Sequence, residues 1–386
     1  MDSKKKILII HPEGNIFNNP NLLAIAKNLS NDFDVDVLMP NKIYTEKSEF
    51  EIISYKPFWN KVKNKIDNYF LYNIVFNLFS LQYKKKYDFI FGVDRLGIID
   101  ACFFSKKLKC NYGLISYEIF FEDETSKKFK AIEIESCKDI SFSIVQDEKR
   151  GQLLSEENKI SNDKMIYIPV ASDGIANKRN REFILHKKFN LSFDVNILIF
   201  IGSVAEWTCI DEILEKANNF LPQNWVLVIH DRYGKAKKRI EQMGLINILG
   251  KNIFLIEDNV FSFDEINSIL SDAELGLVGY RSIYGSPYTG KNIAYIGLSS
   301  GKFSTYMKNG LPALVYNSKD LGEVVINEKL GLFVDNFNDL NIVLNNFFGR
   351  EFYECHCIDY FNHVLSFQNF KYILKRKLDS CMINKT

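Results

Sequence analysis

The 386-residue sequence contains no run of about 20 apolar residues, the length that a helix needs to cross a bilayer. Its first apolar run, Ile7–Ile10, is too short for the core of a signal peptide. Lysine plus arginine (49) and aspartate plus glutamate (48) nearly cancel, whereas a general nucleic-acid binder usually has a large basic excess. We therefore expect a cytoplasmic protein without a nucleic-acid partner.

Motifs for common cofactors are also missing. No G-x-G-x-x-G stretch is present, so bound NAD is not expected. No Asp-x-Asp motif lies in a suitable loop for a divalent ion. The seven cysteines are scattered, and the one cluster, Cys355-His356-Cys357, lacks a second ligand pair at zinc spacing. We expect reduced thiols, no metal site and no cofactor.

What the first half contains is an alternation of short apolar runs with amphipathic segments. Such an alternation predicts an α/β fold with a parallel sheet covered by helices. We assign residues 1–175 to this domain. Its predicted strands are 7–10, 35–39, 88–93, 112–116 and 141–145, and its predicted helices are 21–29 and 97–108.

The second half repeats the alternation, although no repeat is visible in the residues themselves. The predicted strands are 197–201, 225–229, 253–256 and 275–278, and the predicted helices are 211–219 and 263–270. We assign residues 195–357 to a second doubly wound domain. Residues 361–378 predict a closing helix within a tail of residues 358–386. Ligands of such sheets bind at the carboxyl ends of the strands, so the loops there are where we expect a site.

The segment Ser299–Val315 has the character of an anion site. Ser299 or Ser300 can cap a helix N-terminus, whose free N–H groups and dipole favour negative charge. Gly301 and Lys302 follow, and the lysine adds a positive charge. Gly310 is suited to end that helix. The alternative is an ordinary capped helix that leads into a buried strand.

This segment resembles the donor-binding segment of GT-B-fold glycosyltransferases, especially the retaining family 4. Lys302, Tyr306, Gly310 and Pro312 stand at the matching positions. The family's two glutamates, eight positions apart, are replaced here by Gly297 and Thr305, and Thr305 can still bind a hydroxyl.

The resemblance implies two Rossmann-like domains facing a central cleft, with the closing helix crossing back to the first. It implies a metal-independent, retaining transfer of a sugar from a nucleoside diphosphate sugar to a glycan or glycolipid hydroxyl. Bacterial surface polysaccharide synthesis is the expected setting.

The resemblance also places other donor-binding residues. Gly202 and Ser203 correspond to the first turn of the donor domain, where the family's phosphate-binding Arg and Lys are replaced by Ser203 and Trp207. His230 and Arg232 follow the next strand, and Asp258 and Val260 lie in the expected nucleobase loop. The candidate phosphate-binding cations are Arg232, Lys291 and Lys302.

In the first half, Tyr117 and Glu118 resemble an Asp-x-His-Glu signature that lines the sugar site. Glu118 is the predicted catalytic carboxylate, and His11 is a candidate for proton transfer. The expected acceptor-binding residues are Gly14, Asn15, Tyr117 and Asp147. For each, a structural or surface role is the alternative: helix capping for Asp147, for example.

Residues 55–87 mix basic and aromatic side chains. The lysines are Lys56, Lys61, Lys63, Lys65, Lys84, Lys85 and Lys86, against a single acidic residue, Asp67. Such a segment can lie on an anionic membrane, which would make the protein peripheral on the inner face of the cell membrane. It can equally be a helix pair packed on the first domain with its lysines in solvent.

Two further functions remain open. A nucleotide-sugar epimerase of the same fold would use the same donor site without an acceptor. A degenerate, non-catalytic transferase would act as a binding subunit, and the replaced glutamates motivate that alternative.

Overall fold

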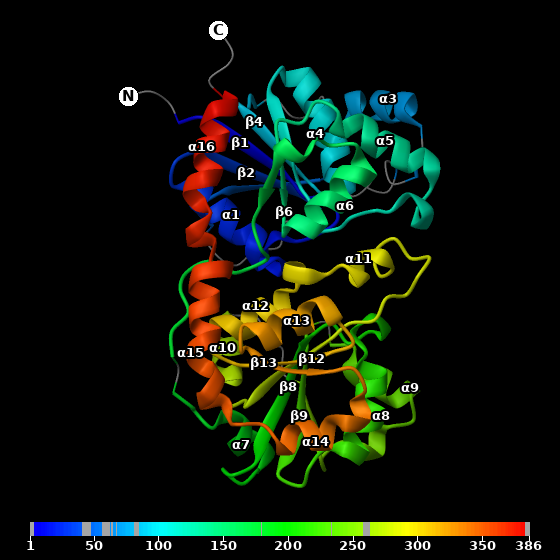
Figure 1. The fold of residues 1–386 in the computed structure, drawn as a ribbon. Coiled ribbons are helices and arrows are strands. Elements are labelled where there is room, and N and C mark those ends of the chain that lie inside the picture. The colour runs from blue at the N-terminus through cyan, green and yellow to red at the C-terminus, as the bar shows by residue number, and fades with distance from the viewer. Residues whose placement is uncertain are drawn as a thin grey trace. The chain divides into compact units, whose positions relative to one another are not determined.

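The computed structural model describes residues 4–40, 48–55, 62, 65–66, 68–80, 85–178, 180–232, 234–257 and 263–382. The chain forms two compact units (Figure 1). The first unit contains residues 1–174, 284–295 and 366–386. The second contains residues 175–283 and 296–365. Asp258 and Val260, which are predicted to bind the nucleobase, lie outside the described residues.

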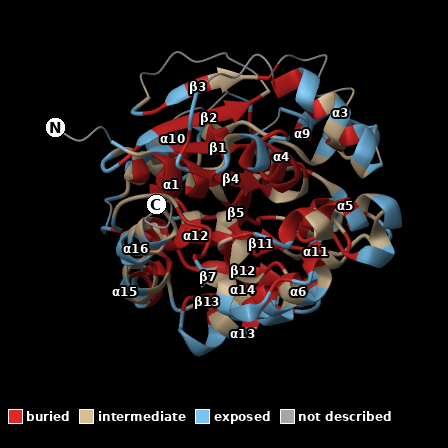
Figure 2. Ribbon diagram, turned by 90° about the horizontal axis from the view of Figure 1, so that it is seen from above, coloured by how far each residue is buried: buried red, intermediate tan, exposed pale blue. Residues whose placement is uncertain are grey.

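A parallel seven-stranded sheet in the order β3-β2-β1-β4-β5-β6-β7 forms the centre of the first unit. Alternate residues of β1 serve two cores: Ile7 and Ile9 pack with α1 and α16 on one face, and Leu8 and Ile10 with α3 and α4 on the other. Figure 2 shows the buried strands between the more exposed helices.

The strands of the first unit are β1 (Lys6–Ile10), β2 (Asp34–Met39), β3 (Glu51–Ser54), β4 (Phe89–Val93), β5 (Asn111–Ile115), β6 (Ser143–Val145) and β7 (Met165–Tyr167). Its described helices are α1 (Pro20–Ser30), α3 (Tyr69–Ser80), α4 (Asp94–Leu108), α5 (Lys127–Cys137), α6 (Glu148–Asn158), α11 (Lys291–Ala294) and α16 (Lys371–Met382).

The second unit is built on a parallel six-stranded sheet in the order β10-β9-β8-β11-β12-β13. Its strands are β8 (Asn196–Gly202), β9 (Trp225–Asp231), β10 (Ile253–Ile256), β11 (Leu275–Gly279), β12 (Ala313–Tyr316) and β13 (Gly331–Val334). Its helices are α7 (Ile184–Phe189), α8 (Ile210–Phe220), α9 (Ala236–Gln242), α10 (Phe263–Ser271), α12 (Gly301–Lys308), α13 (Lys319–Asn327), α14 (Leu340–Asn345) and α15 (Arg350–Tyr360).

The predicted fold class is confirmed, because both sheets are parallel and covered by helices. In each sheet the strand order reverses at one point: β1 beside β4 in the first unit, and β8 beside β11 in the second. Loops that leave such strands diverge to opposite faces of the sheet and open a crevice at its carboxyl edge. The two reversal points are therefore where a ligand site is expected.

The closing helix predicted over residues 361–378 is confirmed only in part, because it is not continuous. α15 is followed by a π-helical turn (Phe361–Leu365) and a 3-10 turn (Phe367–Asn369), and α16 begins at Lys371. Ser366 interrupts the helical path, since its hydroxyl donates to the Gly174 carbonyl (2.8 Å) and accepts from the Gln368 N–H (3.3 Å). Beyond it, Leu374 and Leu378 of α16 are buried in the core of the first unit.

No helix among the described residues is long and apolar enough to cross a membrane.

Candidate functional site

In the second unit, the side chain of Tyr306 lies between β8 and β11, where the strand order of the sheet reverses. β8 and β11 pair only through Leu275 with Leu198 and Gly276 with Ile199. Beyond that pair the hydroxyl of the buried Tyr306 donates to the Ile199 carbonyl (3.1 Å) and accepts from the Ile201 N–H (3.2 Å). The ring fits because Gly276 has no side chain; a Cβ there would lie 2.4 Å from the ring. Tyr306, which matches the family motif, is therefore a buried residue that fixes the backbone of β8 beside the site.

Lys302 extends over the end of β8. Gly202, the last residue of β8, has φ of +117°, a conformation that suits glycine, and a Cβ there would lie 3.6 Å from Lys302 Cε. The Lys302 ammonium lies 4.1 Å from the centre of the Phe200 ring and 5.2 Å from that of Tyr280. Its Nζ is shielded from solvent and has no hydrogen-bond partner among the described residues, although other atoms of the side chain are partly exposed.

Burial lowers the pKa of Lys302 to about 7, and the nearby positive charge of Arg232 acts in the same direction. Burying an ammonium without a hydrogen-bond acceptor costs free energy. An anion bound beside Lys302 would therefore stabilise its charged form.

The N-terminus of α12 lies directly before Lys302 in the chain. Ser300 caps it by accepting a hydrogen bond from the Phe303 N–H (3.3 Å), as the sequence predicted for this pair of serines. The Ser300 hydroxyl is also 2.8 Å from that of Tyr280, whose ring stacks on Trp207 with centres 6.0 Å apart and planes 8° apart. A capped helix N-terminus, a free ammonium and an aromatic wall therefore meet at this carboxyl edge.

The other predicted donor residues of this unit are placed as follows. Ser203 follows Gly202 at the same edge. His230 is buried at the end of β9, and burial lowers its pKa. Arg232 is exposed, and its N–H donates to the Gly202 carbonyl (3.1 Å). Thr305 is directed elsewhere, because its hydroxyl donates to the Gly301 carbonyl one turn earlier (2.8 Å).

One candidate cation, Lys291, belongs to the first unit, where it pairs with Asp123 at 2.5 Å. Residues 284–295 leave the second unit, and the chain returns to it at Ile296. Phosphate binding by Lys291 stays a prediction.

The first unit holds a separate polar cluster at the carboxyl edges of β4 and β5. Asp94, directly after β4, adopts φ of 54° and accepts hydrogen bonds from the N–H groups of Tyr117 (2.6 Å) and Glu118 (2.8 Å). Burial raises the pKa of Asp94 well above its usual range, and the Glu118 charge adds to the rise. This carboxyl group fixes the backbone that carries Glu118.

Asn292 of α11 binds the Glu118 side chain. Its amide nitrogen donates to the Glu118 carboxylate, and its amide oxygen accepts from the Ile119 N–H (3.0 Å) and from the Arg150 guanidinium (3.1 Å). Arg150 also donates to the carbonyl of Tyr117 (2.7 Å). Side chains of α4, α6 and α11 therefore hold the loop between β5 and α5 in place through hydrogen bonds.

The carboxylate of Glu118 titrates near neutrality. Burial raises its pKa to about 7, while the charge of Arg150 and the hydrogen bond from Asn292 oppose that rise. A carboxylate with such a pKa can exchange a proton at physiological pH, which a general acid or base must do. Among the described residues of the first unit it is the strongest candidate for chemistry.

The remaining predicted residues of the first unit have local roles. His11 is buried after β1, burial lowers its pKa to about 4, and its ring packs against Gly14. Asn15 accepts from the Phe17 N–H (2.9 Å), and Asp147 caps α6 by accepting from the Arg150 N–H (2.8 Å). Tyr117 donates from its hydroxyl to Asn21 (2.7 Å). Acceptor binding by Gly14, Asn15, Tyr117 and Asp147 stays a prediction.

Sequence reasoning missed Asp94, Arg150 and Asn292 in the first unit and Tyr280 in the second. Asp94 and Tyr280 carried a usable signal, since each directly follows a buried strand of the sheet. Asn292 carried none, because it lies 174 residues from Glu118 in the chain.

The sequence matches no protein-family model and no curated protein. Solved structures match over nearly the whole chain. Sucrose-phosphate synthase from Thermosynechococcus elongatus has a TM-score of 0.70 at 12% identity, covering 99% of this chain and 100% of its own. Anabaena HepE in complex with UDP and glucose has a TM-score of 0.67 at 11% identity, covering 97% and 100%. WaaG, a glycosyltransferase involved in lipopolysaccharide biosynthesis, has a TM-score of 0.60 at 14% identity, covering 98% and 100%.

The chain has the GT-B fold. At these identities the likeness establishes the fold alone. Within GT-B, the cluster around Lys302 lies in the second unit and the cluster around Glu118 in the first.

Proposed function

We propose that this protein is a glycosyltransferase that moves a sugar from a nucleoside diphosphate sugar to a hydroxyl group of a glycan or glycolipid. The observation that carries the proposal is the shielded ammonium of Lys302, which no side chain or backbone group in the described part of the chain pairs, beside the capped N-terminus of α12. Both features stabilise a dianionic leaving group as its charge develops. HepE, with which the chain shares its fold, is solved with UDP and with UDP-glucose, which favours UDP as the nucleotide.

In the proposed reaction, Lys302 and the free N–H groups of α12 bind the diphosphate. The aromatic wall of Trp207 and Tyr280 excludes water from that charge. Glu118, in its ionised form, orients the acceptor hydroxyl or stabilises positive charge at the anomeric carbon. The proposal includes retention of the anomeric configuration, independence of metal ions and a place in bacterial surface polysaccharide synthesis.

The first test is ligand-induced stabilisation. We expect UDP, among UDP, GDP, CDP and ADP, to raise the melting temperature in proportion to the logarithm of its concentration. A ligand present at 100 times its Kd stabilises the folded state by about 2.7 kcal/mol. If no nucleotide raises the melting temperature, the proposal is wrong. If a nucleotide binds but no acceptor is glycosylated, the donor sugar distinguishes the two alternative functions. An epimerase would convert the nucleotide sugar, whereas a non-catalytic binding subunit would leave it unchanged.

A pH dependence of binding follows from Lys302. Its pKa of about 7 lies below that of an ordinary lysine, so above pH 7 the unliganded group is increasingly neutral. A bound diphosphate favours the ammonium and raises this pKa, so binding should take up a proton at pH 8. The affinity for UDP should then fall by up to about tenfold per pH unit above 7.

Calorimetric titration in two buffers of different ionisation enthalpy measures that proton. Equal binding enthalpies in both buffers at pH 8 would show that Lys302 does not titrate on binding. A Lys302→Met variant, which has no titrating group at this position, is the control and should show equal enthalpies.

A further inference from the structure

Helix α3 of the first unit has no charged residue over its twelve positions, Tyr69–Ser80. Its inner side is fully packed: Tyr72 and Phe76 lie against the Phe103 ring of α4, with ring centres 5.4 and 5.3 Å apart. The Tyr72 hydroxyl also donates to the buried carboxylate of Asp100 at 2.6 Å. These contacts fix which side of α3 faces outward.

That outward side is apolar as well. Phe70, Ile74 and Leu78 recur every four residues and are 69%, 45% and 58% exposed, and Leu71 beside them is 54% exposed. Figure 2 shows exposed stretches along α3. An ordinary surface helix would place polar residues there. A continuous exposed apolar stripe indicates a binding surface, whereas single exposed apolar residues do not.

The surroundings of the stripe are basic. Lys106 Nζ of α4 lies 2.8 Å from the Tyr69 hydroxyl, and Lys107 Nζ lies 2.7 Å from the Ser80 hydroxyl, so the two lysines reach both ends of α3. Neither forms an ion pair with a carboxylate among the described residues. Glu135, an acidic residue of α5 near Tyr69, is paired with Lys138 at 2.5 Å.

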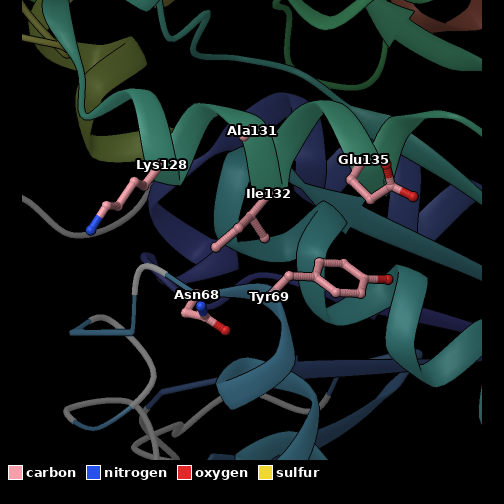
Figure 3. A pocket seen from close by; sticks show the side chains of 6 residues that line it. All are labelled: Asn68, Tyr69, Lys128, Ala131, Ile132 and Glu135. Atoms are coloured by element: carbon pink, nitrogen blue, oxygen red, sulfur yellow. The ribbon is translucent and has the colours of Figure 1, made fainter.

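A groove of about 570 Å³ lies beside the first turn of α3 (Figure 3). Asn68 and Tyr69 form one wall, and α5 forms the other through Lys128, Ala131, Ile132 and Glu135. Ile132 faces the Tyr69 side of the groove, and Lys128 extends from its rim (Figure 3). The groove has apolar side chains between Lys128 and Glu135, and Lys128 is the group that could contact the phosphate of one lipid headgroup beside the stripe.

We propose that α3 docks the protein on an anionic phospholipid bilayer. The helix lies in the plane of the interface, with Phe70, Leu71, Ile74 and Leu78 among the acyl chains and Lys106 and Lys107 at the phosphate level. At about 18 Å long, it can present the whole stripe to one leaflet. Lipid fits better than a protein partner, because the stripe itself is apolar and only Asn73 and Asn77 beside it are polar, while each end of α3 has a lysine that pairs with no carboxylate among the described residues. The inference is independent of the proposed transferase activity.

Vesicle sedimentation tests the proposal. The purified full chain should bind vesicles of phosphatidylcholine with about one-third phosphatidylglycerol at about 0.05 M salt, and largely dissociate at about 0.5 M salt. Pure phosphatidylcholine vesicles should bind it weakly. A Phe70→Ser, Ile74→Ser, Leu78→Ser variant should bind at least about tenfold more weakly. A Lys106→Gln, Lys107→Gln variant should lose about fivefold per lysine on anionic vesicles only.

The matched control replaces three exposed apolar residues of the second unit, Ile326, Ile342 and Phe348, by serine. It should bind vesicles as the wild type does. Circular dichroism melting curves of all variants should stay close to that of the wild type, because the substituted apolar side chains are exposed. Failure of the wild type to bind anionic vesicles at low salt overturns the proposal. So does a wild-type dimer that the α3 variant alone makes monomeric, since the stripe is then a contact between copies.

Discussion

Replacement of Glu118 by glutamine is expected to lower the turnover of sugar transfer by about 10²–10⁴-fold, with nucleotide affinity nearly unchanged. Glutamine keeps the shape of the side chain and can still accept the hydrogen bond from Asn292. A lower turnover would therefore be due to the missing negative charge and titratable proton. Nucleotide affinity should persist because Lys302 and the N-terminus of α12 belong to the other unit. Initial rates with the UDP-sugar donor, together with calorimetric titration of UDP, measure the two quantities.

The pH profile separates chemistry from packing. Since the pKa of Glu118 is about 7, wild-type turnover should rise with pH through that value as the carboxylate ionises. The glutamine variant should lose this rise. Glu122→Gln, a change at an exposed position of the same loop region, is the matched control and should keep both rate and profile. Normal turnover in Glu118→Gln would mean that Glu118 only orders its loop.

The same variant should show a stability effect of definite sign. Because the folded-state pKa of Glu118 lies above its ordinary value of 4.5, the folded state holds this proton more tightly than the unfolded state. That contribution is fully present below pH 4.5 and is lost as pH rises through 7. Glu118→Gln should therefore be more stable than the wild type at pH 8, by up to about 3 kcal/mol, and show little gain at pH 4. Urea unfolding at the two pH values measures the difference.

Replacement of Lys302 by methionine is expected to weaken UDP binding by about 10- to 150-fold. This range corresponds to losing a charge-assisted hydrogen bond of about 1.5–3 kcal/mol. Methionine preserves the apolar stem that lies over Gly202 and the ring contact with Phe200. In the absence of nucleotide, the variant should melt at a higher temperature than the wild type at pH 7, because a buried ammonium without a partner is removed.

A misfolded variant would lose stability as well as UDP affinity. A higher melting temperature together with a lower UDP affinity therefore excludes misfolding as the cause. Lys319→Met, at the exposed first residue of α13, is the control and should leave the UDP affinity unchanged. Calorimetric titration and thermal melting are both needed. A stable Lys302→Met protein with wild-type affinity for UDP would remove the diphosphate assignment from this lysine.

The architecture could be predicted because its signals are local. The run Ile7–Ile10 has apolar residues on both faces of a strand, which only a sheet covered on both sides can bury. Ser299 or Ser300 and Gly310 were predicted to mark the two ends of α12 for the same reason: a cap, which proves to be Ser300, and a left-handed C-terminal residue act within one turn of the helix. The break in the closing helix was not predicted because Ser366 takes its partner, Gly174, from 192 residues away.

The sequence by itself determined two parallel α/β sheets, the loops at their carboxyl edges, and the segment that carries Lys302. The tertiary structure decided which side chains meet there. Tyr306 reaches between β8 and β11 only because those strands are neighbours at the reversal of the sheet. Asn292 binds Glu118 only because residues 284–295 join the first unit. Local propensity acts over a few residues, whereas the partners of a buried polar group depend on strand order and on crossovers that bring distant segments together.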